Sequence, residues 1–354
     1  MKENSCIFNN ENHTFVIAEA GSNWKVGTYQ EDLEMAKKLI SSAADAGADA
    51  VKFQTFRSET VYAKNAGKVT LHDKKTVVTI NELFEKLSMK YEMIEILSSY
   101  CKNNNIMFMS TPFSVEDAKH LNPYVEIYKI ASFEINHIRL LEYIASTKKP
   151  VIISTGASYV EEINYLVDLM KKNESGQVGL LQCTSRYPCE IEKLNLSNIP
   201  MMIKKYNLPI GFSDHSIDPI IGPLTAIGFG ARIIEKHFTL DKALSGPDHF
   251  FAVNPSELKI MISAIREADK AKGSGIKEVL DEEKELRRFA TRSIQAISDI
   301  KQGEILNEGK NFDVLRPGNQ KRGLEARHIN KIEGKKASHE IKIGEGITLE
   351  DCVN

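Results

Sequence analysis

The chain has 354 residues and a formal net charge of −2 at pH 7. This balance argues against a dedicated nucleic-acid-binding protein, because neutralising phosphates requires a basic surface. The length exceeds the needs of one core, so we expect a large domain and a smaller one. Five scattered cysteines without a CxxC pair, a polar N-terminus and no apolar run of about 20 residues favour a cytoplasmic protein.

Short apolar runs alternate with helix-like segments between about residue 15 and residue 265. The eight runs span residues 15–21, 50–56, 106–113, 125–132, 151–157, 178–185, 210–216 and 232–239. In the first intervening segment, apolar residues recur at helical spacing, namely Leu33, Ala36, Leu39, Ile40 and Ala43. Eight strand–helix units in about 250 residues predict an α/β fold, a (β/α)₈ TIM barrel, with a doubly wound sheet as the structural rival.

The polar residues of these runs lie at their ends. In a barrel, the C-terminal ends of all eight strands meet at one mouth, where active sites form. Helix capping could explain the serines and threonines there. It does not explain the following residues: Glu19, Lys52, Gln54, Lys129, His215, Lys236 and His237. The placement of these side chains therefore favours the barrel.

Lys52 and Lys129 lie among apolar strand residues, where a lysine is costly to bury without a partner. Each could pair with a carboxylate or extend its ammonium to water. Each could instead form a Schiff base, because desolvation lowers the pKa of a lysine. The third interpretation is an anion site for a phosphate and a carboxylate, completed by hydroxyl donors at other strand ends, Thr111, Ser132, Ser154 and Ser213.

His215 and His237 end the seventh and eighth runs. A single histidine at a strand end is more often structural than a ligand. However, the seventh and eighth strands are neighbours in a barrel, and two imidazoles at one mouth suit a divalent transition metal. Spacing fixes no third ligand, and Glu19, Asp214 and Asp248 are possible completions. Asp248 belongs to GPDH, which is either a turn or a loop that binds sugar hydroxyls.

After Ile265 the sequence is interrupted by glycines and then becomes highly charged. We expect a catalytic barrel over residues 1–270, a linker with helical stretches over 271–290, and a small, mostly β domain over 291–354. Short β-like runs, SIQAI, FDVLR and HEIKI, are separated by glycine-containing turns in this last part. Roughly 65 residues is near the lower limit for an independent core, so we expect this domain to dock on a partner surface.

Nine motifs occur in the order IAEAGSNW, VKFQTF, STPF, YKIASFE, STGA, LLQCTSRYP, IGFSDHS, EKHFTLD and GPDH. With these motifs and RPGN at 316–319, nearly the whole chain resembles the sialic acid synthase family, including its C-terminal antifreeze-like (SAF) module. The resemblance implies condensation of phosphoenolpyruvate with an open-chain N-acetylated amino sugar, typically N-acetylmannosamine, to a nonulosonic acid and phosphate. It also implies a divalent metal, Mn²⁺ or Mg²⁺, and a domain-swapped homodimer.

The resemblance also implies roles for individual residues. His215 and His237 would hold the metal. Phosphoenolpyruvate would be bound by Lys52, Thr111, Lys129, Ser132, Ser154, Ser185 and Ser213. The sugar would be bound by Glu19, Gln54, Tyr187 and Asp248, with Glu19 managing a proton. An arginine of the partner subunit's small domain closes the sugar site in the family, and RPGN makes that residue Arg316.

Three departures from the family pattern leave the sugar open. Trp24 stands where many members have histidine and would change the mouth, IASFE replaces an SGE-type sequence, and Ser185 stands where several members have asparagine. The main expectation is an N-acetylneuraminate synthase, with a legionaminic or pseudaminic acid synthase as the alternative; GPDH points away from the pseudaminic branch. Rivals of other classes are a Schiff-base aldolase using Lys52 or Lys129 and a non-catalytic carbohydrate-binding module.

Overall fold

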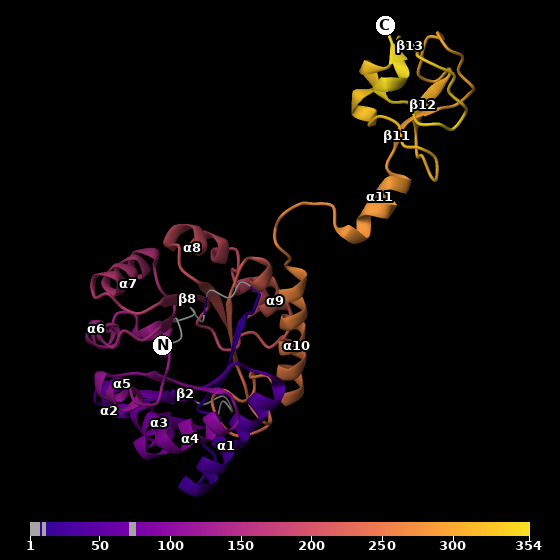
Figure 1. The fold of residues 1–354 in the computed structure, drawn as a ribbon. Coiled ribbons are helices and arrows are strands. Elements are labelled where there is room, and N and C mark those ends of the chain that lie inside the picture. The colour runs from indigo at the N-terminus through magenta and orange to yellow at the C-terminus, as the bar shows by residue number, and fades with distance from the viewer. Residues whose placement is uncertain (1–7, 9–11, 71–75) are drawn as a thin grey trace. The chain divides into compact units, whose positions relative to one another are not determined.

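The computed structural model describes residue 8, residues 12–70 and residues 76–354. The chain divides into two compact units, the first ending at Gly273 and the second running from Ser274 to Asn354. Figure 1 shows the elements of both units, coloured from indigo at the N-terminus to yellow at the C-terminus. Each unit has its own hydrophobic core.

Within the described residues, the first unit is built on an eight-stranded parallel sheet in the order β5-β2-β1-β10-β9-β8-β7-β6. The strands are β1 (Phe15–Gly21), β2 (Ala50–Thr55), β5 (Met107–Pro112), β6 (Tyr128–Ile130), β7 (Val151–Ser154), β8 (Val178–Cys183), β9 (Ile210–Asp214) and β10 (Ile233–His237). The two terminal strands of this order, β5 and β6, also pack against each other, so the sheet curls into a nearly closed barrel. The predicted TIM barrel is confirmed, and the doubly wound alternative is wrong.

Each barrel strand is followed by at least one helix, and these helices surround the strands (Figure 1). They are α1 (Tyr29–Ala46), α4 (Tyr91–Asn103), α5 (Val115–Leu121), α6 (Ile138–Ser146), α7 (Val160–Lys172), α8 (Asn198–Tyr206), α9 (Ile221–Gly228) and α10 (Pro255–Ala271). Helix α1 begins at a capping box between Thr28 and Glu31 and ends at Gly47 in the left-handed conformation. No helix of the described segments combines the length and apolar character needed to cross a bilayer.

The barrel interior explains why the strand ends carry the polar residues. An apolar cluster fills the barrel and includes Ile17, Ala50, Met109, Ile127, Ile152, Leu181 and Ile233. Side chains alternate along a strand, so the residue two positions further on faces the same interior. Those positions are occupied by Glu19, Lys52, Thr111, Lys129, Ser154, Cys183 and Glu235. The barrel thus changes from an apolar layer to a polar layer at its C-terminal end.

The connection from β2 to α4 contains elements that the pattern of apolar runs does not predict. They are α2 (Ser58–Val61), the antiparallel strands β3 (Lys68–Thr70) and β4 (Val77–Thr79), and α3 (Ile80–Leu87). Helix α3 begins at a second capping box, between Thr79 and Glu82. Because this insertion follows the C-terminal end of a strand, it belongs to the mouth side of the barrel.

The second unit contains α11 (Lys284–Ala290) and two short antiparallel pairs, β11 (Ser293–Ala296) with β12 (Phe312–Leu315) and β13 (Lys336–Ala337) with β14 (Cys352–Val353). Its core includes Ile294, Phe312 and Ile341. The runs SIQAI and FDVLR form strands as expected. The run HEIKI does not, because Ile341 makes only an isolated bridge to Ile300 while its side chain enters the core.

Candidate active site

Two lysines and two glutamates form a buried ion network at the polar layer of the barrel. Lys52 Nζ lies 2.6 Å from Glu19 Oε2 and 3.6 Å from Glu235 Oε2. Lys129 Nζ lies 3.5 Å from Glu235 Oε1. Burial opposes the charge of Glu235, but the Lys129 and Lys52 ammonium groups hold its pKa at about 2. The structure therefore shows carboxylate pairing, one of the three interpretations that the sequence left open for these lysines.

Hydroxyl groups from neighbouring strands contact the same network. Lys52 donates to Thr111 Oγ1 at 3.2 Å, and Lys129 donates to Ser154 Oγ at 2.8 Å. The Ser213 hydroxyl donates to Glu235 Oε1 at 2.8 Å. Ammonium and hydroxyl donors that converge in a buried place are suited to an oxyanion, which they can bind by charge-assisted hydrogen bonds.

The ends of β6, β7 and β8 pack closely around Gly156. Its N–H donates to Ser132 Oγ at 2.9 Å, and Ser132 lies 3.6 Å from Cys183 Sγ. A Cβ atom on Gly156 would lie 2.3 Å from Ser185 Oγ and 2.9 Å from Cys183 Sγ, so an alanine there would have to displace these side chains. Ser185 Oγ is buried and has no hydrogen-bond partner among the described residues. This hydroxyl is free to bind a ligand.

The two histidines lie at the C-terminal ends of neighbouring strands, as expected: His215 directly follows β9, and His237 is the last residue of β10. The β9 and β10 ladder is parallel, and the centroids of the His215 and His237 rings lie 5.4 Å apart. His215 Nδ1 lies 2.9 Å from the Thr184 carbonyl oxygen. Because a carbonyl can only accept, Nδ1 carries the hydrogen, and Nε2 keeps the lone pair that a metal requires.

His237 also fits a ligand role. Its Nδ1 is buried without a hydrogen-bond partner in the described structure, and the nearest carboxylate oxygen, Asp248 Oδ2, is 3.8 Å away. Burial, followed by nearby His215 and Lys52, holds the pKa of His237 well below its usual value. The described residues contain no group of three His, Cys, Asp or Glu side chains that could hold a metal. A site of two imidazoles leaves positions for substrate or water.

Asp214 does not complete this pair, although the sequence allowed it. Its Oδ2 lies 2.7 Å from Lys236 Nζ, and both side chains are buried. The alternation that turns Ser213 and Glu235 inward turns their neighbours Asp214 and Lys236 outward. Glu19, the other acidic candidate on a strand, is engaged by Lys52.

The side chains expected to bind a sugar gather around Gly21. Gln54 Nε2 donates to Glu19 Oε1 at 2.9 Å, and a Cβ on Gly21 would lie 3.1 Å from Asp248 Oδ2 and 3.3 Å from Glu19 Oε1. Gly21 has a φ of +51°, so glycine relieves both strain and crowding there. Burial, followed by the neighbouring Glu19 charge, raises the pKa of Asp248 to about 7. Tyr187 is half-exposed, and its ring centroid lies 4.2 Å from that of His215.

Two acidic residues of the site were not singled out from the sequence. Glu235 balances both lysines, and its position two residues after the inward-facing Ile233 is the signal that could have identified it. Glu134 follows β6 in a short 3₁₀ turn (Ser132–Glu134), and its Oε2 is buried without a partner in the described chain. Burial raises the pKa of Glu134 to about 7, against the opposing charge of Lys129.

The sequence also pointed to Arg316 and Trp24. Arg316 follows β12 in the second unit, and its side chain is exposed. Trp24 is 2% exposed and belongs to the core between strands and helices. It also lines a cavity of about 700 Å³ with Tyr29 and Arg57. The Trp24 ring therefore packs in this core, and its effect on the ligand-binding mouth stays a prediction.

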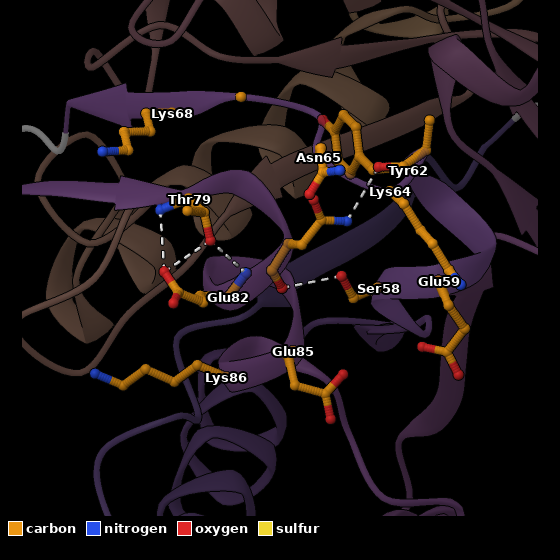
Figure 2. A pocket seen from close by; sticks show the side chains of 13 residues that line it. Ser58, Glu59, Tyr62, Lys64, Asn65, Lys68, Thr79, Glu82, Glu85 and Lys86 are labelled. Carbon is orange, nitrogen blue, oxygen red and sulfur yellow. Dashed lines mark hydrogen bonds between the residues drawn. The ribbon is translucent and has the colours of Figure 1, made fainter.

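A further cavity of about 980 Å³ lies in the insertion after β2. Figure 2 shows side chains of both charges around it, with Glu82 turned back to its capping partner Thr79. The lysines are Lys64, Lys68 and Lys86, and the glutamates are Glu59, Glu82 and Glu85. None of the site residues expected from the sequence lines this cavity.

The fold and the site define a TIM-barrel protein with its buried charged residues at the strand C-termini. The NeuB family matches residues 39–277, and the SAF domain matches residues 291–353. The chain belongs to the NeuB family.

Similar proteins carry different product names. The pseudaminic acid synthase of Campylobacter jejuni is 37% identical over 350 residues, which cover 97% of this chain and 98% of that protein. The N,N'-diacetyllegionaminic acid synthase of the same organism is 38% identical over 334 residues, covering 93% and 97%. The crystal structure of an N-acetylneuraminic acid synthetase from Leptospira borgpetersenii is 36% identical, with a TM-score of 0.69 over 78% of this chain and 90% of that one.

Proposed function

We propose that this protein condenses phosphoenolpyruvate with an open-chain N-acetylated amino sugar and releases a nonulosonic acid and phosphate. The observation that carries the proposal is the buried pair Lys52 and Lys129, which meets hydroxyl groups at a barrel mouth beside two buried imidazoles. Phosphoenolpyruvate carries a phosphate and a carboxylate, so it needs two cationic subsites. The names of the relatives, all synthases of nonulosonic acids, support the same reaction.

In this proposal, phosphoenolpyruvate enters the polar layer of the barrel. Its oxygens accept hydrogen bonds from the following side chains: Lys52, Thr111, Lys129, Ser132, Ser154, Ser185 and Ser213. The unpartnered hydroxyl of Ser185 supports its inclusion. Because the ammonium groups are already held by buried contacts, little reorganisation is needed when the anion binds.

We assign His215 and His237 as ligands of a divalent metal, Mn²⁺ or Mg²⁺. The Thr184 carbonyl supports this assignment by fixing the tautomer of His215, and the unpartnered Nδ1 of His237 supports it further. When bound, such a metal supplies Lewis-acid polarisation of the sugar aldehyde. Both histidines would hold this group, and the contact with the Thr184 carbonyl oxygen orients the His215 ring.

Glu19, Gln54, Tyr187 and Asp248 are assigned to the sugar. The C3 carbon of phosphoenolpyruvate forms the new bond to the aldehyde carbon, water adds at C2, and cleavage of the C–O bond then releases phosphate. Glu19 takes part as the proton-managing group, because burial raises the pKa of its carboxyl. We further propose that the enzyme is a homodimer in which Arg316 of the partner subunit contacts the sugar.

The identity of the sugar is a finer question, because relatives with three different product names share 36–38% identity with this chain. N-acetylmannosamine is our first candidate and a 2,4-diacetamido-dideoxy sugar the second. Product masses from a panel of N-acetylmannosamine, its 6-phosphate and the diacetamido sugars will assign the substrate.

The decisive assay is phosphate release from phosphoenolpyruvate. Release should require the enzyme, the amino sugar and a divalent metal together, and it should stop after exhaustive chelation. Phosphate release without the sugar, or no release with any sugar of the panel, contradicts the proposal. Borohydride trapping with pyruvate tests the aldolase rival, because a stable adduct on Lys52 or Lys129 would require a Schiff base.

A further inference from the structure

Lys236 lies between two residues of the site but faces away from it. On β10, Ile233 belongs to the barrel interior, whereas Ile234 belongs to the core between strands and helices. Alternation therefore places Lys236 on the outer face, opposite Asp214 of β9 in the ladder. The side chain of Lys236 is 1% exposed, and the reaction proposed above gives it no role.

The ammonium of Lys236 binds four oxygens at the end of β9 and in the segment that follows. Its Nζ lies 2.7 Å from Asp214 Oδ2, 3.2 Å from Ser216 Oγ and 3.0 Å from the Asp218 carbonyl oxygen. It also donates to the Ser216 carbonyl oxygen. Asp214 Oδ1 accepts the Ser216 N–H at 2.7 Å, which closes a loop of bonds around His215.

We propose that Lys236 is a positioning residue that sets the separation of the two imidazoles and thereby the affinity for the metal. It is the chain neighbour of His237, and it binds both chain neighbours of His215. One side chain therefore ties together the backbones that carry the two rings. This inference rests on the proposed function, in which these histidines hold a divalent metal.

A purely structural role for the same ion pair is the alternative. Removing one partner of a buried ion pair destabilises the fold wherever the pair lies, so loss of stability in a variant does not separate the two explanations. Metal affinity does separate them, because residues that orient metal ligands typically change it by about 10–100-fold. The readout should therefore be direct binding of Mn²⁺ to the full-length protein without either substrate.

The test compares Lys236→Met with Lys149→Met. Lys149 is a matched control, because its ammonium also binds loop carbonyls, those of Asn122 and Val125, but precedes β7 at the opposite end of the barrel. Free Mn²⁺ is measured from its electron paramagnetic resonance signal during titration. We expect Lys236→Met to raise the Kd for Mn²⁺ about 10–100-fold. Lys149→Met should lower the unfolding temperature and leave the Kd unchanged.

A second variant keeps the inference testable if Lys236→Met does not fold. Lys236→Arg keeps the positive charge beside Asp214, but a planar guanidinium cannot reproduce the contacts to Ser216 and Asp218. It should weaken Mn²⁺ binding several-fold, and saturating Mn²⁺ should restore kcat. A folded variant of Lys236 with the wild-type Kd overturns the inference.

The same titration on His215→Ala and His237→Ala keeps this inference separate from the proposed function. If these variants bind Mn²⁺ like the wild type, the metal site itself is wrong. If they lose binding while folded Lys236 variants retain it, only the positioning role fails.

Discussion

Glu235 offers the sharpest test of the ion network, because one carboxylate faces two buried lysines. Glu235→Gln keeps the shape but removes the charge that Lys52 and Lys129 share. The gap between its pKa of about 2 and the usual 4.5 corresponds to about 3 kcal/mol at pH 7. This figure matches the cost of about 3–5 kcal/mol for breaking a buried ion pair. Because the pKa is lowered, this stabilisation is complete above pH 4.5 and is lost as the pH falls toward 2.

The measurement is thermal unfolding of the full chain at pH 7, with and without phosphoenolpyruvate. The first unit of Glu235→Gln should unfold roughly 5–10 °C below the wild type. Phosphoenolpyruvate should stabilise the variant more than the wild type, because the anion supplies the missing negative charge. Glu267→Gln is the control, since its exposed pair with Lys270 should contribute at most about 1 kcal/mol. An unchanged unfolding temperature for Glu235→Gln would refute the charge balance.

Three further predictions concern other parts of the site. Gly156→Ala should raise the KM for phosphoenolpyruvate strongly, because its Cβ would meet Ser185 Oγ at 2.3 Å, whereas Gly228→Ala, with open space around it, should behave like the wild type. Glu134→Gln should stabilise the protein at pH 8 and have little effect at pH 4.5, because a raised pKa costs the wild type stability as the pH rises toward 7; equal effects at both pH values contradict this. Mixing inactive Arg316→Ala and His215→Ala subunits should restore activity, and failure to do so contradicts the shared site.

The barrel and its polar mouth could both be predicted from the pattern of residues along the strands. Alternation along each strand, with an apolar residue two positions before a polar one, indicates both the barrel and its polar mouth. The same pattern shows that Thr111, Ser154 and Ser213 share this layer, which the hydrogen bonds to Lys52, Lys129 and Glu235 bear out. Local sequence can therefore predict which residues lie at the strand ends that the barrel brings together.

Sequence could not decide which charges pair. The sequence does not single out Glu235, and it leaves Asp214 as one of three possible completions of the histidine pair, because spacing along the chain does not say which neighbour a side chain meets. Cross-strand register settles this, since it places Ser213 opposite Glu235 inside and Asp214 opposite Lys236 outside.

By itself, the sequence determined the fold, the mouth and the family resemblance, because these depend on periodicity and motif order. The tertiary structure decided the charge balance of Lys52 and Lys129, the burial of Trp24 in the core and the bonds of Lys236 around His215. These depend on distances between residues far apart in the chain, and such distances exist only once the strands have closed into the barrel.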